Sequence, residues 1–519
     1  MPEPPAENVA FDRAKAGRRP PGTRDVYPVD MLRRRYLMES WRAVSVRHGF
    51  EEIDGPTFEH SDLYAVKSGE GILGELFQAY SGKDAAEVAE VMRTGRGPYA
   101  LRPEFTPTLA RMYAARAKQL AKPTRWFCIP QFFRAERPQR GRLREFLQWN
   151  VDVVGDGSVE ADADVFAIVV DALRAFNIRP SVARVCVGNR GHVEHLLSKE
   201  SIPEAAWPEW FALIDKLEKL SPDEFAAHAS SVGFERETVE RVRRVLTSDD
   251  FFDPFAEELA TASPTTALGH RMQKLGRAAV VQGSSEYFRY RRTIVRGLAY
   301  YTGTVFELIA EGERAVAGGG RYDKLIELMG GPPTPAVGFA MGDVVLSLLL
   351  HDHGLMPGGG EADSTAGVDV GELMDAVQRV QSSYSLRPDA FVVPNGDEGN
   401  EELVTPLVAR LRRGAESARY LDREDRKPWH ADRYEPSAGG VAPLHARTTS
   451  KSTRNLKKLL ADATAQHARF AVVIHGADKV QLKDLDARED LAHPTRGDFS
   501  TEPGVENDVV RAIAERLGR

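Results

Sequence analysis

Four segments of the chain place charged or polar side chains within apolar or strand-like surroundings. They are ALRPEFTPTLARM at 100–112, FFRAERPQRGRLREFLQWNVDVVG at 132–155, RRTIVRGLAYYTGTVFEL at 291–308 and AVAGGGRYDKL at 315–325. Burying an unpaired charge is costly, so each such charge is expected to have a partner. These four segments are therefore the candidates for a functional site.

The first segment carries a carboxylate next to a proline. Glu104 follows that proline, and Thr106 lies two residues later, on the same side of the chain if the chain is extended. A carboxylate so placed can accept hydrogen bonds from an ammonium group. The alternative, which this segment alone favours, is a helix that starts after Pro107 with Thr106 as its cap.

The second segment is rich in arginine. Arginine presents a planar fork of donors that suits phosphate oxygens, although a solvated hairpin tip would also be charged. The strand after it carries Gln148, Asn150 and Asp152 in strict alternation, so all three share one face. A face with two amides and a carboxylate would line a pocket or meet solvent. The arginines are Arg134, Arg137, Arg140, Arg142 and Arg144.

The third and fourth segments combine arginine, glycine and tyrosine. Arg296 and a glycine stand shortly before two tyrosines, in a segment of strand-like composition that is either exposed or lines a site. In the fourth segment, glycines at 318–320 permit close backbone approach before Arg321 and Tyr322. Taken alone, this triplet predicts a turn that leads into a helix.

Other common site patterns are missing or weak. His192 and His195 do not have the metalloprotease spacing, and no phosphate loop or dinucleotide-binding glycine motif is convincing. Cys128 and Cys186 lie far apart and match no metal or redox spacing. No protein-bound metal site is therefore predicted, and the cysteine usage indicates a reducing, cytoplasmic compartment.

The length of 519 residues suits about three domains. A formal net charge of -7 and a pI near 6.1 reveal no global basic field, although a local basic groove can be hidden in such a total. The N-terminal residues lack the apolar core of a signal peptide. No apolar run reaches the roughly 18 residues that would predict a membrane span.

Periodicity predicts the elements that must hold these segments. Strand-like runs at 126–133 and 147–154 predict two antiparallel strands joined by a long charged loop, and strand character is also expected over 293–308. Helical spacing at 31–46 predicts a helix before the core. Beyond a glycine-rich linker, alternating strands and helices predict a small three-layer α/β domain.

The expected organisation is a disordered lead-in, a core interrupted by a helical insertion, a linker, and a C-terminal domain with a mobile insertion of its own. The predicted ranges are 1–20 for the lead-in, 21–193 and 263–352 for the core, 194–262 for the helical insertion, 353–385 for the linker, 386–519 for the C-terminal domain and 421–452 for its insertion.

Five motifs, in their order along the chain, resemble the histidyl-tRNA synthetases, which are class II enzymes. The similarity begins at GTRDVYP, 22–28, and continues through the C-terminal domain. It implies the class II synthetase fold: an α+β core with an antiparallel sheet flanked by helices, a helical insertion and a C-terminal α/β domain that binds the anticodon region. It also implies a homodimer. The motifs are LRPEFTP, FRAERPQRGRLREFLQWNVDVVG, VRGLAYYTGTVFE, AGGGRYD and VGFAMGD.

The resemblance implies a role for each matching residue. Arg134 would contact the ATP α-phosphate, Glu136 and Arg142 would lie in the ATP site, and Arg296 would lie beside the substrate carboxylate. Two tyrosines would flank the imidazole of histidine, and four polar side chains would bind and orient the substrate around its amino group. The two tyrosines are Tyr301 and Tyr322. The four polar side chains are Glu104, Thr106, Gln148 and Asp152, and Asp152 stands where some relatives have glutamate.

The implied reaction attaches L-histidine to tRNA(His) through a histidyl-adenylate. A carboxylate oxygen of histidine attacks the α-phosphorus of ATP, and two guanidinium groups, Arg134 and Arg296, stabilise the charge that concentrates there. No protein nucleophile is needed, because the substrate supplies its own. Mg²⁺ on the pyrophosphate is the expected cofactor.

Two departures from the family pattern keep alternatives open. Ala299 stands where family members commonly have aspartate, and Val344 and Val345 replace a Glu-Arg pair whose arginine covers adenine. Valine cannot make a cation–π contact, so either another arginine such as Arg321 covers the base or adenine is held differently. The alternatives to the enzyme are a histidine-sensing regulatory subunit of ATP phosphoribosyltransferase and a tRNA-binding module without chemistry.

Overall fold

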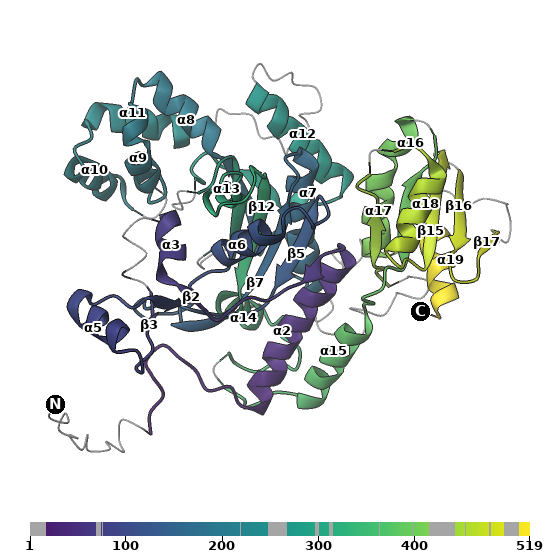
Figure 1. Ribbon diagram of the computed structural model, residues 1–519, viewed down its shortest axis with the longest axis horizontal. Coiled ribbons are helices and arrows are strands. Elements are labelled where there is room, and N and C mark those ends of the chain that lie inside the picture. The colour runs from purple at the N-terminus through teal and green to yellow at the C-terminus, as the bar shows by residue number, and fades with distance from the viewer. Residues whose placement is uncertain are drawn as a thin grey trace.

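The computed structural model shows a large core with a group of helices at one end and a second, smaller sheet at the other (Figure 1). None of the described helices is both long enough and apolar enough to cross a membrane. The described residues are 17–68, 74, 76–217, 220–247, 267–295, 300–310, 315–362, 364–396, 398–414, 442–451, 453–476, 479–492 and 508–518.

Within the described residues, the core is built on a nine-stranded sheet. Neighbouring strands pair antiparallel from β5 through to β8, and only the two outermost pairs are parallel. The predicted antiparallel core sheet is therefore confirmed. In spatial order its strands are β1 (Glu51–Glu52), β5 (Thr124–Cys128), β7 (Glu145–Val154), β12 (Ala336–Gly342), β11 (Ala317–Arg321), β10 (Thr304–Ala310), β8 (Ala183–Asn189) and β9 (Phe288–Tyr290), and β6 (Gln131–Phe133) pairs with β7.

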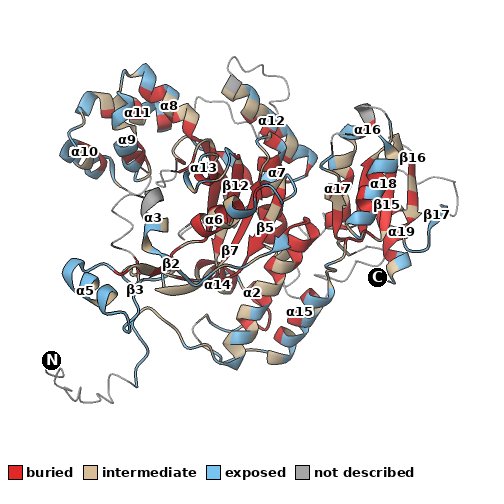
Figure 2. Ribbon diagram, in the orientation of Figure 1, coloured by how far each residue is buried: buried red, intermediate tan, exposed pale blue. Residues whose placement is uncertain are grey.

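Helices bury one face of this sheet in the main apolar cluster, and Figure 2 shows the strands beneath them as buried. The helix predicted at 31–46 is α2 (Pro28–Arg47). Beside it, α7 (Val159–Ala175) begins after Ser158, whose side chain accepts a hydrogen bond from the Ala161 amide and so caps the helix. Also at or beside the sheet are α12 (Ala267–Val281), η3 (Ser285–Tyr287) and α14 (Asp343–Asp352).

A second apolar cluster covers part of the opposite face. It includes side chains of α6 (Thr106–Arg116) and α13 (Leu325–Leu328). The prediction that the glycine triplet forms a turn is wrong, because these glycines belong to β11. A Cβ atom on Gly319 would lie 2.2 Å from the carbonyl oxygen of Gly338, so glycine is what lets β11 and β12 approach.

The strand expected over 293–308 is shorter than predicted. Residues 293–295 and 300–303 are not strand, 296–299 are outside the described residues, and β10 begins only at Thr304. By contrast, the two antiparallel strands predicted around the arginine-rich loop are confirmed, because both β5 and β6 pair with β7. A separate small sheet is formed by β2 (Phe58–His60), β4 (Tyr99–Leu101) and β3 (Gln78–Ala79), near α3 (Ser61–Ser68) and α5 (Ala85–Thr94).

The insertion is helical, as predicted, wherever it is described, and its helices bury a small apolar cluster of their own. Residues 218–219 and 248–262 of the predicted 194–262 range lie outside the described residues. The insertion's exact boundaries therefore stay a prediction. Its helices, with the one that leads into it, are α8 (Arg190–Lys199), η1 (Glu204–Ala206), α9 (Trp207–Ile214), α10 (Pro222–Ser231) and α11 (Arg236–Thr247).

The predicted linker, 353–385, contains a helix that belongs to the core. This helix, α15 (Val370–Ser382), packs against α2 and buries Leu373, Val377 and Val380 in the main apolar cluster. Those positions have the three- and four-residue spacing of an amphipathic helix, a signal that the glycine-rich stretch before it masked. The flexible connection is therefore shorter than the sequence suggested.

The C-terminal domain has the predicted three layers, with apolar clusters on both faces of a mixed sheet. Residues 446–448, expected in an insertion without periodicity, instead form an edge strand parallel to its neighbour, while 415–441 lie outside the described residues. In spatial order the strands are β14 (Ala446–Thr448), β13 (Ala390–Pro394), β15 (Phe470–Gly476), β16 (Lys479–Asp484) and β17 (Glu489–Leu491); the helices are α16 (Glu398–Glu402), α17 (Val404–Arg413), α18 (Leu456–Ala465) and α19 (Asp508–Leu517).

Buried charges hold the C-terminal domain against the core. Arg412 of α17 donates to the carbonyl oxygen of His48 at 3.3 Å and approaches its Nδ1 at 3.4 Å. The other ring nitrogen of His48 lies 2.9 Å from Asp171 of α7, which also pairs with Arg413 at 3.5 Å. Burial lowers the pKa of His48 to about 4. The histidine is therefore neutral at pH 7, with its proton on the nitrogen that faces Asp171.

Candidate active site

One cavity, termed the central pocket, collects most of the side chains that the sequence assigns to the site. It lies over β7, β12 and β11, on the face of the sheet opposite α7. Trp149, Val151 and Val153 belong to the cluster beneath the helices, so the alternating residues between them must face the pocket. The predicted residues that line it are Glu104, Thr106, Arg134, Gln148, Asp152, Tyr301 and Tyr322.

Small residues on β12 make room for the polar side chains of β7. Asp152 is directly opposite Gly338, Asn150 is opposite Ala340, and Gln148 is opposite Gly342. A Cβ atom on Gly338 would lie 2.0 Å from a carboxylate oxygen of Asp152, which is far inside van der Waals contact. The carboxylate can therefore lie across the neighbouring strand only because that position is glycine.

Asp152 is oriented by a buried tyrosine. The hydroxyl of Tyr322 donates a hydrogen bond of 2.5 Å to Asp152, and the side chains belong to residues that are 2% and 4% exposed respectively. Burial and the adjacent carboxylate raise the pKa of Tyr322 well above its usual value, so the phenol keeps its proton and remains a donor. The ring centre of Tyr300 lies 4.5 Å from that of Tyr301 in a tilted arrangement and 6.1 Å from that of Tyr322 in an edge-on arrangement, which gives the pocket an aromatic side.

Glu104 and Thr106 stand where a strand passes into a helix. The helix that the alternative for this segment predicted is present as α6, but it begins at Thr106 rather than after Pro107, the cap residue is Phe105, and no side chain caps the helix. Thr106 lines the central pocket instead. The preceding turn is held by the buried Arg102, which donates to the carbonyl oxygens of Gly55 at 2.8 Å and Gln131 at 2.9 Å.

Arg134 brings the positive charge of the arginine-rich loop to the pocket. It follows β6, donates from Nε to the carbonyl oxygen of Pro103 at 3.1 Å, and its guanidinium carbon lies 5.2 Å from the ring centre of Phe146. Glu136 lies 3.9 Å from Arg134 and pairs with Arg142 at 2.5 Å. Glu136 and Arg142 do not line the pocket. Because Glu136 contacts both arginines, the three side chains form a chain of charges that leads from Arg134 away from the pocket.

Arg321 points away from the central pocket. Its Nε lies 2.8 Å from Asp162, and its terminal nitrogens donate to the carbonyl oxygens of Asp156 and Ser158 at 3.2 and 2.5 Å. Because side chains alternate along β11 and into the residue that follows, Arg321 and Tyr322 must face opposite sides of the sheet. The suggestion that Arg321 covers adenine is therefore wrong for this arrangement, and its role is to tie β11 to the start of α7.

The other positions that the sequence singled out lie beside the pocket or outside the described residues. Arg296 and Ala299 lie outside the described residues. Val345, in the first turn of α14, is buried, and its side chain would lie 3.2 Å from a Cβ atom on Gly141 of the arginine-rich loop. Asp343 accepts a hydrogen bond from the amide of β7 residue Leu147 at 2.9 Å and also pairs with Arg24, so it joins the N-terminal segment to the sheet.

Several pocket residues were absent from the sequence-based site. Tyr300, Gly338 and Ala340 line the cavity, and Asn150, noted only as part of a polar face, lines it too. The alternation of small residues in VGFAMG was a sequence signal for Gly338 and Ala340 on β12. This signal could not be interpreted without knowing which residues of the neighbouring strand lie opposite them.

The described residues contain no group of three or more histidine, cysteine or acidic side chains that could hold a metal ion. Mg²⁺ does not require such a group, because it is commonly held by one or two carboxylates together with substrate phosphates. Glu136, next to Arg134, provides one such carboxylate near the predicted phosphate position.

Residues 22–343 match the family model described as histidyl-tRNA synthetase. The histidine–tRNA ligase of Opitutus terrae is 36% identical over 346 residues, which cover 65% of this chain and 75% of that protein. The histidine–tRNA ligase of Thermococcus kodakarensis is 34% identical over 383 residues, covering 73% of this chain and 78% of that protein.

Solved structures support the fold. A histidyl-tRNA synthetase from Nostoc aligns with a TM-score of 0.50 at 21% identity and covers 96% of this chain and 99% of that one. A protein from Bacillus halodurans, described as an ATP phosphoribosyltransferase regulatory subunit/histidyl-tRNA synthetase, aligns equally well at 0.50 and 20% identity, covering 88% and 98%, so fold alone does not separate the two functions. The family match spans more than half of the sequence and includes all the residues of the central pocket, and the chain therefore belongs to the histidyl-tRNA synthetase family.

Proposed function

We propose that the chain is a histidine–tRNA ligase that forms histidyl-adenylate in the central pocket and then transfers histidine to tRNA(His). The observation that carries this proposal is that two carboxylates, two amides, an arginine and three tyrosines from separate segments line one cavity. Family membership supports histidine, ATP and tRNA(His) as substrates.

The lining of the pocket suits the two ends of histidine. Glu104 and Asp152 can accept hydrogen bonds from the substrate ammonium, and Gln148 and Thr106 add neutral polar contacts around it. Tyr301 offers an aromatic surface to the imidazole. The proton that Tyr322 donates to Asp152 fixes that carboxylate before the substrate binds, which lowers the cost of ordering it.

Activation needs positive charge where the carboxylate of histidine meets the α-phosphate of ATP. Arg134 lies at the pocket and would stabilise the pentavalent transition state from one side. We assign the second guanidinium to Arg296 from the family resemblance. Glu136 and Arg142 would lie along the remaining phosphates, where Mg²⁺ bound to the pyrophosphate would offset its negative charge.

The C-terminal α/β domain is proposed to bind the anticodon region of tRNA(His), chiefly through phosphate contacts that weaken as salt increases. We also propose that the chain is a homodimer, as the resemblance to class II enzymes implies. Sizing in solution would test the dimer, and the salt dependence of tRNA binding would test the phosphate contacts.

The second candidate function is a histidine-sensing regulatory subunit without ligase activity. It is favoured by the loss of the Glu-Arg pair at Val344 and Val345, since Val345 is packed in the core and offers no cation to adenine. It is opposed by the presence of the C-terminal domain and of Arg134 at the pocket. A tRNA-binding module without chemistry would leave Glu104, Gln148 and Asp152 without a purpose.

Histidine-dependent exchange of labelled pyrophosphate into ATP separates these candidates. The ligase should catalyse exchange only when histidine is present, and Arg134→Ala should abolish it. Arg137→Ala is a matched control from the same loop that leaves the pocket lining unchanged. A wild-type protein that binds histidine without any exchange would establish the regulatory alternative and refute the ligase.

A further inference from the structure

Residues 300–303 supply part of the central pocket but do not belong to a strand. Tyr300 and Tyr301 line the pocket just before β10 begins. A backbone hydrogen bond of 2.8 Å, from the amide of Thr302 to the carbonyl oxygen of Arg321, joins this segment to the end of β11. Segments outside a strand ladder have fewer backbone hydrogen bonds, so side-chain contacts matter more for their position.

The side chain of Thr302, next to these tyrosines, is held by Asp323 in two ways. Its hydroxyl donates to Oδ2 of Asp323 at 3.2 Å and accepts from the amide of Asp323 at 3.1 Å. One residue therefore engages this hydroxyl both as a donor and as an acceptor. Asp323 directly follows Tyr322, whose hydroxyl orients Asp152. The Thr302–Asp323 contact thus joins two segments that each supply a tyrosine to the pocket.

The other carboxylate oxygen of Asp323 holds the start of β12. Oδ1 accepts a hydrogen bond from the amide of Ala336 at 3.1 Å, and the carbonyl oxygen of Ala336 accepts from the amide of Tyr322 at 2.9 Å. Gly338, which makes room for Asp152, lies two residues after Ala336 on the same strand. One carboxylate therefore ties together the three segments that supply the tyrosines and the glycine of the pocket.

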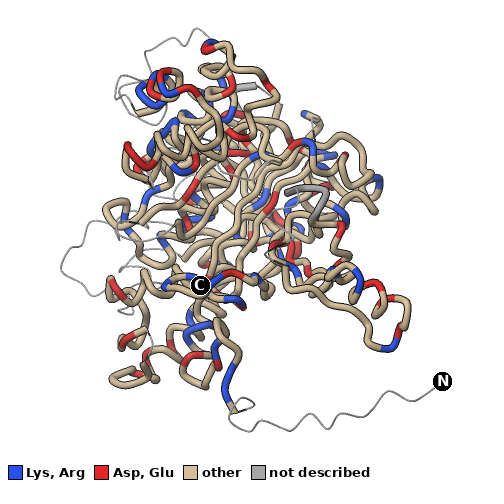
Figure 3. The backbone as a smooth tube through the Cα atoms, turned by 90° about the vertical axis from the view of Figure 1, so that its left-hand side faces the viewer, with Lys and Arg blue, Asp and Glu red and all other residues tan. Residues whose placement is uncertain are grey.

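Asp323 differs from the ion-paired carboxylates at the surface. Acidic and basic residues are intermixed over the molecule (Figure 3), and exposed ion pairs usually contribute little to stability. The guanidinium of Arg321 lies 3.4 Å from Asp323 but only 2.8 Å from Asp162. The closer contacts of Asp323 are neutral donors, namely the Thr302 hydroxyl and the Ala336 amide. These contacts fix the positions of two pocket segments rather than compensate a charge.

Neither Asp323 nor Thr302 lines the central pocket, so their effect on a ligand is indirect. We propose that both are positioning residues for histidine, which hold the aromatic side of the pocket beside the carboxylate of Asp152. This inference rests on the proposed function, because that function assigns the pocket to histidine. Loss of the contact would leave Tyr300 and Tyr301 chemically unchanged but less well ordered, and ordering them on binding would cost affinity.

Variants of Thr302 test the proposal with little change in volume. Thr302→Val replaces the hydroxyl by a methyl group of similar size, whereas Thr302→Ser keeps the hydroxyl. We expect Thr302→Val to raise KM for histidine in the exchange assay by about three- to tenfold, because the contact with Asp323 is lost, while KM for ATP changes little. Thr302→Ser should have a KM for histidine close to that of wild type.

Asp323→Ala should have the larger effect, raising KM for histidine by about tenfold or more, because the contact with Ala336 is lost as well. The matched control is Glu327→Ala, an equal loss of charge by an exposed carboxylate in α13 that does not line the pocket. In the double variant, Thr302→Val should add little to the effect of Asp323→Ala, because both changes break the same contact.

The two kinetic constants separate positioning from a purely structural role. A change that only destabilised the fold would lower the amount of active protein, and hence kcat, while both KM values stayed as in wild type. The proposal is overturned if Thr302→Val has the KM for histidine of Thr302→Ser, or if Asp323→Ala lowers kcat with an unchanged KM for histidine. Additive effects in the double variant would also overturn it, because the two residues would then act separately.

Calorimetric titration of the full chain with histidine keeps this test separate from the proposed activity. A wild type that binds histidine without exchange would refute the ligase, while weaker binding by Thr302→Val would still support the positioning role. If wild type shows exchange but Thr302→Val and Asp323→Ala bind histidine as tightly as Glu327→Ala, the positioning role fails and the ligase stands. A wild type that binds no histidine would refute both.

Discussion

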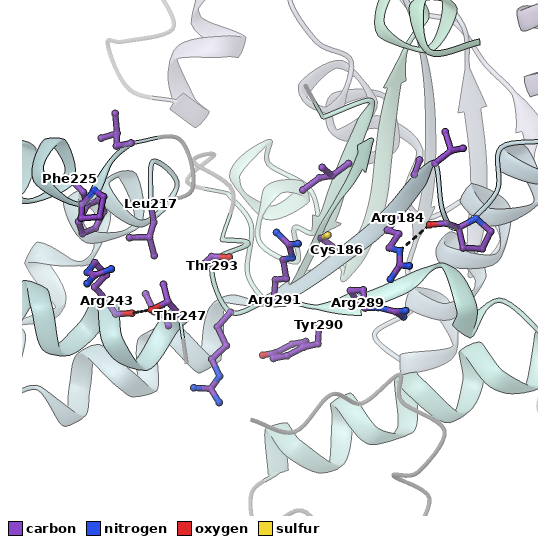
Figure 4. Close-up of a pocket in the computed structure, with 18 of the residues that line it drawn as sticks. Arg184, Cys186, Leu217, Phe225, Arg243, Thr247, Arg289, Tyr290, Arg291 and Thr293 are labelled. Carbon is purple, nitrogen blue, oxygen red and sulfur yellow. Dashed lines mark hydrogen bonds between the residues drawn. The ribbon is translucent and has the colours of Figure 1, made fainter. Parts of the chain in front are cut away.

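The central pocket and a second cavity, which lies between the edge of the core sheet and the helical insertion and is termed the arginine cleft (Figure 4), occupy one face of the same sheet, yet the described residues that line them have opposite net charge. Among the described residues, the pocket sets two carboxylates and three tyrosines around one arginine, whereas five arginines and several apolar side chains line the cleft. Opposite charges attract, so the carboxylates of the pocket favour the substrate ammonium group that we propose to bind there. One strand, β10, is enough to separate the two environments.

The difference also lies in how each cavity is made. The pocket is carved from strand positions where glycine and alanine oppose polar side chains, so its shape depends on strand register. The cleft forms where a helical lobe meets the sheet edge, so its shape depends on how two substructures pack. Small backbone changes should therefore damage the pocket and spare the cleft.

Gly338→Ala should give the largest effect and sharpen this comparison. The new Cβ atom would lie 2.0 Å from Asp152 in the present geometry, so the carboxylate must move. A displacement of that size can cost about 100-fold in rate, and histidine-dependent exchange should fall by at least that amount. The control is Gly342→Ala on the same strand, where an added Cβ meets nothing within 4 Å and exchange should persist. Equal exchange in the two variants would contradict the assigned pocket.

Asp152→Asn should weaken histidine binding by roughly 10- to 100-fold, because a charged acceptor for the substrate ammonium is lost. KM for histidine in the exchange assay measures this effect, while KM for ATP should change little. A KM for histidine close to that of wild type would remove Asp152 from the substrate site.

Tyr322→Phe should have a smaller effect, raising KM for histidine by about three- to tenfold, because a single hydrogen bond that orients Asp152 is lost while the ring remains. If the tyrosine acts only through Asp152, its removal should matter little in the Asp152→Asn background. A double-mutant cycle measures this coupling, and additive effects would show that the two residues act independently.

His48→Gln should affect neither cavity and should change how the stability of the fold depends on pH in the acid range. Burial lowers the pKa of His48 to about 4, whereas an unfolded histidine titrates near 6.5. The unfolded chain therefore binds an extra proton between these values, so stability present above pH 6.5 is lost as the pH falls toward 4. The variant should remove up to about 1.4 kcal/mol per pH unit from that slope, measured by denaturant unfolding. An unchanged slope would show that His48 is not the buried neutral base.

Much of the site could be predicted from local patterns. The alternation of Gln148, Asn150 and Asp152 fixed their common face, because strand side chains alternate whatever the surrounding fold. The same alternation would have placed Arg321 and Tyr322 on opposite faces of the sheet. The four-residue spacing of Leu373 and Val377 would have revealed helix α15 within the expected linker. These two errors arose from signals that were present but outweighed by glycine-rich neighbours.

Other features could not be predicted, because they depend on contacts between distant segments. The need for glycine at 338 follows from its pairing with Asp152, and the cleft exists only because α11 packs beside β9. The hydrogen bond from Arg412 of α17 to His48 and the ion pair between Arg413 and Asp171 likewise link residues more than 200 positions apart in sequence. No local window contains both partners of such a contact.

The sequence by itself determined the family, the polar face of β7 and the residue types that suit histidine and phosphate, because motifs and side-chain alternation are properties of short stretches. Only the tertiary structure decided which residues share a cavity, where Arg321 points and where a second positive surface forms. The physical reason is that register and packing bring together segments that are remote along the chain, and the shape and charge of a cavity arise only from that encounter.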